Sequence, residues 1–301
     1  MMKQTQFLTI GGKTLRSRLF LGTGRFPNPL VLKQAIDASE TEVLTFAVRR
    51  VQLDAVDEDA VLQHVDRKRF TFLPNTSGAR TADEAVRIAR LARAAGIGNW
   101  VKVEISVADE TLLPDPLETL RATEQLVKEG FVVLPYTSDD PVMCKHLEEA
   151  GAAAVMPGGS PIGTGLGILN PYNIERIVEQ ANIPVIIDAG IGSASDAALA
   201  MELGADAVLV NTAVAKAKDP VAMARAFNLA VKAGREAYAA GRIPKKKTAT
   251  ASSGYESLIS RIPVTGPSSP SSLSGPSSTY GHSEASGLSS PSSPSSTSGS
   301  R

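Results

Sequence analysis

Cysteine, histidine, aromatic side chains and net charge are all scarce in this chain. One Cys and three His among 301 residues exclude a disulfide within the chain and a Cys-rich zinc site, and we expect no metal. Lys+Arg and Asp+Glu number 31 each, so the formal net charge of zero argues against a nucleic-acid binder. No apolar run reaches the roughly 20 residues that span a bilayer, so we expect no membrane partner. A start without a secretory signature and the lone Cys144 are typical of a cytoplasmic protein.

The composition changes sharply near Gly254. Residues 254–301 are dominated by Ser, Pro and Gly, and such a segment buries too little apolar surface to offset the entropy lost on folding. We therefore expect a disordered tail over residues 254–301 and one folded domain over residues 1–253. A length of about 250 residues is usual for a single (β/α)8 barrel.

Eight short β-rich runs alternate with helical patterns in the folded part. The expected strands are residues 18–21, 43–48, 70–73, 100–105, 131–134, 153–156, 185–187 and 207–210. The expected helices, several of which begin at a capping residue or Pro and end before Gly, are residues 81–95, 116–129, 140–150, 193–203 and 220–240. This alternation predicts parallel strands with helical crossovers, and eight repeats favour a TIM barrel over an open doubly wound sheet. Gly11-Gly12 predicts an extra hairpin, placed to plug the amino-terminal end of the barrel.

The polar and glycine-rich motifs follow the expected strands. In a barrel of this type the active residues lie at the carboxyl ends of the strands. The motifs at these positions are Gly22-Thr23-Gly24, Arg49-Arg50, Pro74-Asn75-Thr76, Pro135-Tyr136-Thr137, Gly158-Gly159-Ser160, Asp188-Ala189-Gly190 and Asn211-Thr212. We therefore expect them to meet at one end of the barrel and to form a single site.

The fourth expected strand carries charged residues on one face. Side chains alternate along a strand, so Trp100, Lys102 and Glu104 share the face that points into the barrel. A buried cation and carboxylate are costly unless they are paired or used. One interpretation is a structural Lys–Glu pair between barrel layers. The other is a lysine nucleophile whose pKa is lowered by burial and by cations such as Arg49 or Arg50, with Glu104 moving protons on the resulting imine.

Asp188 and the loops around it suggest a second part of the site. An acid after an apolar strand serves either as a loop or helix-cap anchor or as a second acid/base group. Gly-rich turns and helix N-termini present N–H groups to anions, and barrels often bind phosphate after strands seven and eight. The loops with this character are residues 158–165, 189–192 and 211–212. Each glycine cluster alone also suits a tight turn, but their placement on neighbouring loops favours a phosphate site.

In combination, these motifs resemble the thiazole synthase family of thiamine biosynthesis, of the bacterial ThiG type. The resemblance runs from about Phe7 to Ser253. Its motifs are residues 21–24, 49–50, 73–76, 102–104, 112–116, 132–141, 159–163, 167–171, 188–192 and 211–215. Gly158 departs from the family, which usually has a bulkier apolar residue there, and residues 254–301 have no counterpart in it.

The resemblance implies a sulfur-transferring enzyme with defined substrates. A lysine matching Lys102 forms a Schiff base with the ketone of 1-deoxy-D-xylulose 5-phosphate, and carboxylates matching Glu104 and Asp188 move protons as the carbonyl shifts along the sugar. Sulfur comes from the C-terminal thiocarboxylate of a ThiS-type carrier protein, dehydroglycine (2-iminoacetate) supplies the C–N unit, and ring closure gives the thiazole phosphate carboxylate. The resemblance implies a homotetramer and, beyond the covalent imine, no cofactor. The implied phosphate-binding positions are Gly163, Ala189, Gly190, Asn211 and Thr212.

Two other functional hypotheses remain open at this point. A class I aldolase or a pyridoxal phosphate synthase type of barrel shares the lysine and the phosphate loops but needs no carrier-protein surface. A barrel that only binds a phosphate ligand or a partner is the third hypothesis, and the intact Lys102, Glu104 and Asp188 argue against it. Cys144 is expected on a helix away from the site, so the sulfur is expected to arrive on a partner.

Overall fold

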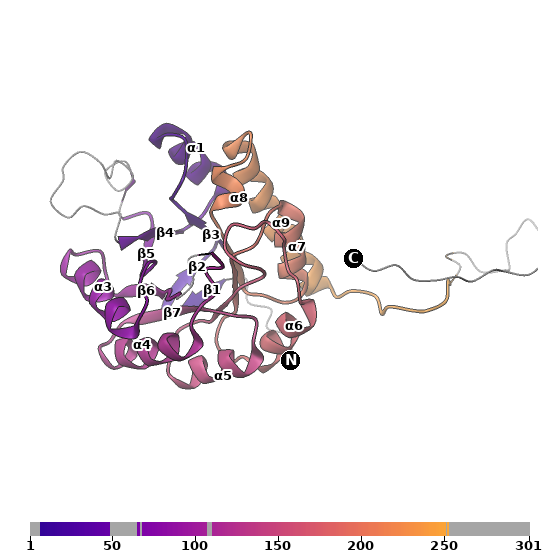
Figure 1. The fold of residues 1–301 in the computed structure, drawn as a ribbon. Coiled ribbons are helices and arrows are strands. Elements are labelled where there is room, and N and C mark those ends of the chain that lie inside the picture. Colours follow the sequence, from indigo (N-terminus) through magenta and orange to yellow (C-terminus); the bar gives the residue numbers. More distant parts are fainter. Residues whose placement is uncertain (1–6, 49–64, 67, 107–109, 251, 253–301) are drawn as a thin grey trace, which may run out of the picture. The chain divides into compact units, whose positions relative to one another are not determined.

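The computed structural model describes residues 7–48, 65–66, 68–106, 110–250 and 252 (Figure 1). The chain divides into two units, Met1–Pro244 and Lys245–Arg301, and every helix and strand named below belongs to the first. In the second unit, the side chains of residues 245–250 and 252 are exposed. The predicted tail, residues 254–301, lies outside the described residues. No helix in the described ranges combines the length and apolar character that a membrane crossing requires.

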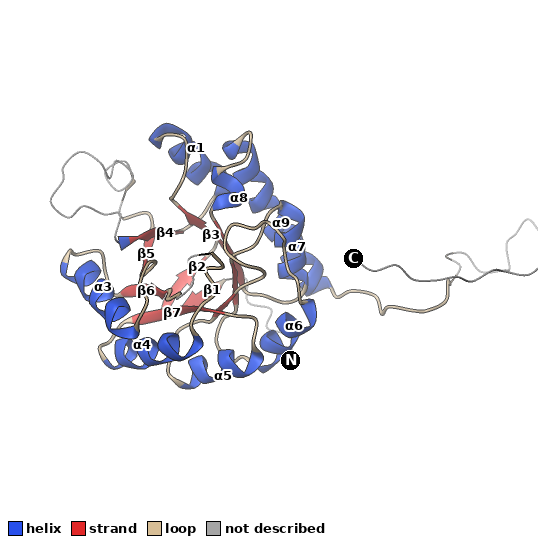
Figure 2. Cartoon of the chain, in the orientation of Figure 1, coloured by secondary structure: helices blue, strands red, loops and turns tan. Residues whose placement is uncertain are grey.

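Eight parallel strands form a nearly closed TIM barrel with helices around it (Figures 1 and 2). The strands are β3 (Leu19–Gly22), β4 (Val43–Ala47), β5 (Thr71–Asn75), β6 (Trp100–Val103), β7 (Val132–Thr137), β8 (Met156–Pro157), β9 (Ile186–Asp188) and β10 (Ala207–Val210). Their order in the sheet is β8-β7-β6-β5-β4-β3-β10-β9. Parallel bridges from Val155 to Val185 and from Gly158 to Asp188 then join the two ends of the sheet. The predicted fold class is confirmed.

The predicted strands all occur in the described residues; β10 has the predicted bounds, and the others differ at one or both ends. β7 continues to Thr137, past its predicted end, whereas β6 stops at Val103. The predicted strand 153–156 corresponds to the two-residue β8, which begins only at Met156, although the residues before it bond to both neighbouring strands. The Ala153 N–H donates to the Val133 carbonyl at 2.9 Å, and the Val155 N–H donates to the Pro184 carbonyl at 3.0 Å.

The helices begin where the local sequence caps them. The helices are α1 (Pro29–Ser39), α3 (Ala82–Ala94), α4 (Pro116–Lys128), α5 (Pro141–Glu149), α6 (Pro171–Gln180), α7 (Ala194–Glu202), α8 (Thr212–Ala215) and α9 (Pro220–Ala240). Five of them start with Pro after an Asn or Asp whose side chain accepts a backbone N–H, namely Asn28, Asp115, Asp140, Asn170 and Asp219. The five predicted helices are confirmed to within one residue at each end, and the differences are cap residues. The helices α1, α6 and α8 were not predicted.

The inside of the barrel is apolar at its amino-terminal end. Inward-facing side chains such as Phe20, Leu73 and Trp100 form one buried cluster. The hairpin β1 (Leu8–Ile10) and β2 (Lys13–Leu15) contributes Leu8, Ile10 and Leu15 to the same cluster, as expected for a plug. The opposite end, where the strands finish, is left for polar side chains.

Strand β6 has its two faces in different surroundings. Val101 and Val103 pack outward into a cluster with side chains of α3 and α4, such as Val86 and Leu126. Trp100 points into the barrel and belongs to the interior cluster. The alternation of the strand therefore also turns Lys102 inward, as predicted.

Candidate active site

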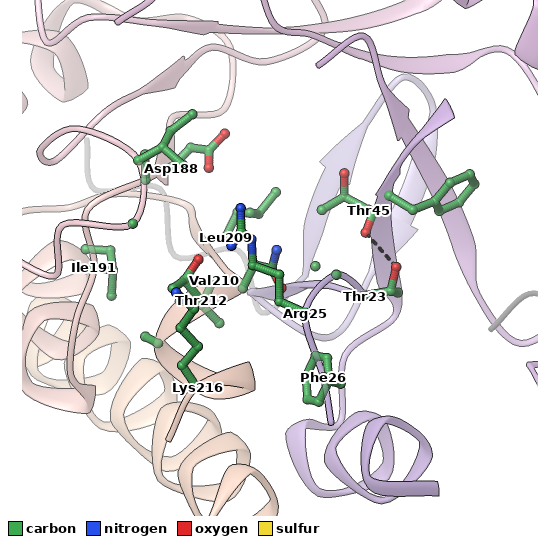
Figure 3. A pocket seen from close by; sticks show the side chains of 18 of the residues that line it. Thr23, Arg25, Phe26, Thr45, Asp188, Ile191, Leu209, Val210, Thr212 and Lys216 are labelled. Carbon is green, nitrogen blue, oxygen red and sulfur yellow. Dashed lines mark hydrogen bonds between the residues drawn. The ribbon is translucent and has the colours of Figure 1, made fainter. Parts of the chain in front are cut away.

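The carboxyl ends of the strands surround a cavity of about 810 Å³ (Figure 3). Its walls come from the loops after β3, β5, β6, β8, β9 and β10, which are distant in sequence. The eight predicted site residues all line it, and they are Lys102, Glu104, Gly163, Asp188, Ala189, Gly190, Asn211 and Thr212. The sequence thus identified residues that the fold brings together, and their chemical roles remain predictions.

Lys102 lies at the closed end of the cavity between two carboxylates. Its side-chain nitrogen contacts Asp188 Oδ2 and lies 3.5 Å from Glu104 Oε2. The ammonium also lies 5.3 Å from the centre of the Tyr136 ring, within the range of a cation–π contact. Lys102 is only 4% exposed and Asp188 only 3%, so water screens this cluster little.

The cluster holds protons more tightly than its members do in water. Burial lowers the pKa of Lys102, but attraction by Asp188 and Glu104 outweighs it, and the net pKa lies above the ordinary value. Burial raises the pKa of Asp188, although the neighbouring ammonium opposes the shift. The two directions have different main causes: two carboxylates around one ammonium raise the pKa of Lys102, whereas burial raises that of Asp188. The prediction of a lowered lysine pKa is therefore wrong for the resting site, and Arg49 and Arg50 lie outside the described residues.

Glu104 is positioned by a threonine on the neighbouring strand's loop. Since β6 ends at Val103, Glu104 is outside the regular ladder. The Glu104 N–H donates to Thr76 Oγ1 at 2.9 Å, and the same hydroxyl lies 2.9 Å from the Glu104 carbonyl oxygen, to which it donates. Thr76 is fully buried. It belongs to a strand-end motif seen in the sequence, but only the fold reveals that it supports Glu104.

The turn after Asp188 has a left-handed backbone that brings two loops together. Ala189 has φ 66° and Gly190 has φ 74°. A Cβ on Gly190 would lie 1.9 Å from Ser160 Oγ, so only glycine is accommodated at this position. The Gly167 N–H donates to the Gly190 carbonyl at 2.9 Å. The glycine-rich loop after β8 is thereby held against the turn that carries Asp188.

Several backbone groups suited to a phosphate face this part of the cavity. The N–H groups of Gly163, Gly190 and Thr212 donate to no acceptor among the described residues. At the N-terminus of α7, two N–H groups already have a partner, because Asp196 Oδ2 accepts from Gly192 and Ser193 at 2.9 and 3.0 Å. The unpartnered N–H groups of the loops therefore remain candidates for the predicted phosphate contacts.

Asn211 connects the last strand to the loop after β3. The amide orientation that satisfies both of its groups lets the NH2 donate to the carbonyls of Gly22 and Gly24, at 3.2 and 2.7 Å. A Cβ on Gly22 would lie 2.6 Å from the Asn211 Cβ, which explains the glycine at the end of β3. The Asn211 side chain is thus occupied within the protein, and its carbonyl accepts from the N–H groups of Val214 and Ala215 at 3.1 and 2.9 Å.

The described residues provide neither a cluster of metal-ligating side chains nor a thiol in the lining of the cavity. No cluster of three or more His, Cys, Asp or Glu suited to a metal occurs in the part of the chain that the structure describes. Cys144 is buried on α5, where burial raises the pKa of its thiol, and it does not line the cavity. The predicted position of Cys144, on a helix away from the site, is confirmed.

Two cations that line the cavity were missed by the sequence reasoning. Arg25 lies in the loop between β3 and α1, and Lys216 directly follows α8. Both are exposed, and Arg25 has a left-handed backbone with φ 69°. The available signal was their position, since Arg25 follows Gly24 and Lys216 lies one helical turn after Thr212.

Comparison with known proteins gives a consistent result. Residues 9–254 match the family model described as thiazole biosynthesis protein ThiG. The chain is 71% identical to the thiazole synthase of Halalkalibacterium halodurans, over 84% of this chain and 98% of that protein. It is 59% identical to the thiazole synthase of Bacillus subtilis, over 83% of this chain and 98% of that protein.

Solved structures agree with these sequence relatives. The BexX/CysO complex of Amycolatopsis orientalis matches with a TM-score of 0.73 and 34% identity, over 80% of this chain and 98% of that chain. The 3-hexulose-6-phosphate synthase of Salmonella typhimurium matches with a TM-score of 0.53 and 20% identity, over 71% of this chain and 98% of that chain. The second likeness is one of fold alone.

Proposed function

Because this chain belongs to the ThiG family of thiazole biosynthesis proteins and therefore serves thiazole synthesis for thiamine, we propose that it builds the thiazole through a Schiff base at Lys102. The observation that carries the proposal is the buried contact between the Lys102 ammonium and Asp188, with Glu104 at 3.5 Å, inside a cavity at the strand ends. The proposed substrate is 1-deoxy-D-xylulose 5-phosphate, with dehydroglycine and a thiocarboxylated carrier protein as co-substrates.

In the first step Asp188 makes the lysine nucleophilic. A protonated amine cannot attack a ketone, and the raised pKa of Lys102 means that the resting amine carries its proton. Asp188 contacts this ammonium directly, and its own pKa is raised, so it is suited to accept the proton. The free amine then adds to the substrate ketone, and loss of water from the adduct gives the imine.

In the following steps Glu104 moves protons on the imine. Shifting the carbonyl along the sugar removes a proton from the carbon beside the imine and returns one to the former imine carbon. Glu104 is partly exposed, unlike Lys102 and Asp188, and so it borders the space that the sugar chain occupies. The Thr76 hydroxyl fixes its backbone, which keeps the carboxylate beside the imine.

The sugar phosphate is held by the loops after β8, β9 and β10. In this proposal the unpartnered N–H groups of Gly163, Gly190 and Thr212 donate to the phosphate oxygens, while Ala189 and Asn211 shape the turns. This arrangement leaves the ketone end of the substrate toward Lys102. It needs no metal and no cofactor other than the imine.

The sulfur donor is proposed to be a carrier protein of the ThiS type. Supporting this, the solved relative at 34% identity is a complex of BexX with CysO. Gly165 lines the cavity, and the segment that follows it runs to the first turn of α6. Three apolar side chains of this segment are exposed, namely Leu166 (62%), Leu169 (62%) and Tyr172 (66%). Exposed apolar side chains next to a cavity are typical of a protein contact surface.

This carrier surface can be tested with a charge placed on it. Leu169→Asp is expected to weaken binding of the thiocarboxylated carrier about tenfold or more, as loss of a central apolar contact does. The matched control is Leu91→Asp, since Leu91 is exposed on the last turn of α3, at the other end of the barrel. Equal binding by both variants in calorimetry would place the carrier elsewhere.

The reaction itself is tested by reconstitution. The full chain is supplied with deoxyxylulose phosphate, dehydroglycine and thiocarboxylated carrier, and thiazole phosphate carboxylate is measured by mass spectrometry. We expect product from the wild type and none from Lys102→Ala. Product from Lys102→Ala at the wild-type rate would overturn the Schiff-base mechanism. The proposed homotetramer is tested by light scattering on the same sample, where a monomer would refute it.

A further inference from the structure

Two cations in the outer part of the cavity have no role in the steps above. Neither Arg25 nor Lys216 forms an ion pair or side-chain hydrogen bond with any described residue. Figure 3 shows both side chains extending into the cavity, with Lys216 reaching toward Thr212 and Arg25 toward Leu209. Unpaired cations that line a cavity are available to an anionic ligand.

The charges of the cavity are separated along its length. Among the described residues that line it, the ionisable ones are Arg25, Lys102, Glu104, Asp188 and Lys216. The inner three leave one net negative charge, whereas the outer two are both positive. An anionic group is therefore repelled from the inner end and attracted by the outer cations, which orients any substrate that carries one.

The proposed reaction brings two anionic groups into this space, the sugar phosphate and the carboxylate of dehydroglycine. The thiazole product keeps both. We propose that Arg25 binds the carboxylate derived from dehydroglycine and that Lys216 completes the phosphate site. This inference rests on the proposed function and adds to it a subsite for the second substrate.

The positions of the two cations favour this division. Lys216 reaches toward Thr212, whose N–H belongs to the proposed phosphate site (Figure 3). Arg25 reaches toward Leu209, which pairs in register with Asp188 in the neighbouring strand, and so it points to the level of the reacting groups (Figure 3). The two cations therefore serve different parts of the ligand.

The chemistry of the side chains agrees with their positions. A guanidinium presents two parallel N–H groups that match a carboxylate, whereas an ammonium acts as a point charge on a phosphate. The left-handed backbone of Arg25 is uncommon for a residue other than glycine. It is held by Asn211, whose amide bonds to the carbonyls of Gly22 and Gly24 just before it. Such a conformation, maintained by a second residue, is typical of a ligand contact.

Product binding separates the two assignments. Calorimetry compares the thiazole phosphate carboxylate with the same thiazole phosphate lacking the carboxylate. For Arg25→Gln we expect binding of the carboxylated ligand to weaken about 10- to 100-fold, the usual size for a charged hydrogen bond, and binding of the other ligand to stay unchanged. Lys216→Gln is expected to weaken both ligands equally. Arg25→Lys keeps the charge but lacks the two parallel N–H groups, so it should weaken binding of the carboxylated ligand to an intermediate degree.

The first half of the reaction gives an independent readout. Borohydride trapping with deoxyxylulose phosphate alone involves no carboxylate. The concentration of this substrate that half-saturates trapping should therefore stay unchanged in Arg25→Gln and rise in Lys216→Gln. The matched controls are Arg87→Gln on the exposed side of α3 and Lys218→Gln, whose side chains do not line the cavity. Thermal unfolding confirms that each variant folds.

The outcomes are distinguishable. Equal weakening of both thiazole ligands by Arg25→Gln would assign Arg25 to the phosphate and overturn the inference, and no weakening of either would overturn it as well. Failure of the wild type to trap the sugar phosphate would refute the proposed function instead.

Discussion

The inner end and the outer loops of the cavity are built in opposite ways. The inner end places Lys102 and Asp188 on regular strands, nearly without exposure and in direct contact with each other. The outer part places Arg25 and Lys216 on exposed loop positions without ion-pair partners among the described residues. Strands hold a reacting group within a fraction of an ångström, whereas loops can present charge to a ligand at little desolvation cost. In the proposed reaction, the strand residues change bonds and the loop residues recognise the substrate.

The largest effect is expected where the inner contact is removed. Asp188→Asn keeps the shape of the side chain but removes the carboxylate that we propose takes the Lys102 proton. Imine formation should slow about 10²- to 10⁴-fold, the usual range for an acid–base group. Rapid-quench trapping with borohydride measures the rate. An unchanged rate would leave Glu104 as the base of this step and remove the distinction between the two carboxylates.

The same substitution tests the electrostatic cost of the inner end. Burial raises the pKa of Asp188, so the folded state holds this proton more tightly than the unfolded chain does. The protonated acid thus stabilises the fold at low pH, and that stability is lost as pH rises through the folded-state pKa. As pH rises above the ordinary Asp pKa of 3.8, the free energy of unfolding of the wild type, measured with denaturant, should therefore fall relative to that of Asp188→Asn. A shift in the opposite direction would contradict the raised pKa.

Glu104→Gln should separate two steps of the reaction at the inner end, imine formation and the later proton transfers. We expect imine formation within a few-fold of the wild type and the later proton transfers about 10²-fold slower, because Glu104 acts after the imine. Single-turnover trapping and thiazole formation measure the two rates separately. Equal slowing of both would merge the roles of the two carboxylates.

Thr76 offers a milder test of the same step. Thr76→Val removes the hydroxyl that fixes the Glu104 backbone, so it should lower the later rate in the direction of Glu104→Gln but by a smaller factor. Thr76→Ser retains the hydroxyl and should restore that rate. If Thr76→Ser is as slow as Thr76→Val, the hydroxyl is not what positions Glu104.

The packing of the outer loops can be tested at Gly190, in the turn that follows Asp188. In Gly190→Ala the new methyl group would overlap Ser160 in a left-handed turn, which should lower the free energy of unfolding by about 1–3 kcal/mol or more. The concentration of deoxyxylulose phosphate that half-saturates the protein should also rise. Gly12→Ala is the matched control, because it has φ 80° and no atom near its Cβ, and so it shows the backbone cost alone. Equal losses would mean that the contact with Ser160 is unimportant.

The smallest effect is expected at Gly158, the position where the chain departs from the family pattern. Its Cβ would meet Tyr136 and the Asp188 carbonyl at 3.5 to 3.6 Å, an ordinary contact distance. Gly158→Ala should therefore stabilise the fold slightly, by about 0.4–1 kcal/mol, because alanine restricts the unfolded chain. The adjacent Gly159→Ala should destabilise it, since that Cβ would lie 3.0 Å from the Gly167 carbonyl oxygen. Denaturant unfolding of both variants measures the contrast.

The sequence could predict features that depend on local patterns, but not features that depend on contacts between distant strands. Strand alternation alone identified Lys102 and Glu104, and the position of Asp188 after an apolar strand identified the third charge. The predicted lowering of the Lys102 pKa was wrong, because the shift depends on a contact between β6 and β9 that no local pattern contains. The roles of Thr76 and Asn211 also depend on strands that are distant in sequence. The starts of α1 and α6 were missed although Asn28-Pro29 and Asn170-Pro171 carry the same cap pattern as α4.

The proposed reaction depends on a covalent bond between Lys102 and the substrate. The direct measurement is to incubate the full chain with deoxyxylulose phosphate, reduce it with borohydride, digest it and map the adduct by mass spectrometry. The account predicts one adduct, on the peptide that contains Lys102, and none in Lys102→Ala, which loses the amine inside the barrel. An adduct on another lysine, such as Lys216, or an adduct that persists in Lys102→Ala, would contradict it.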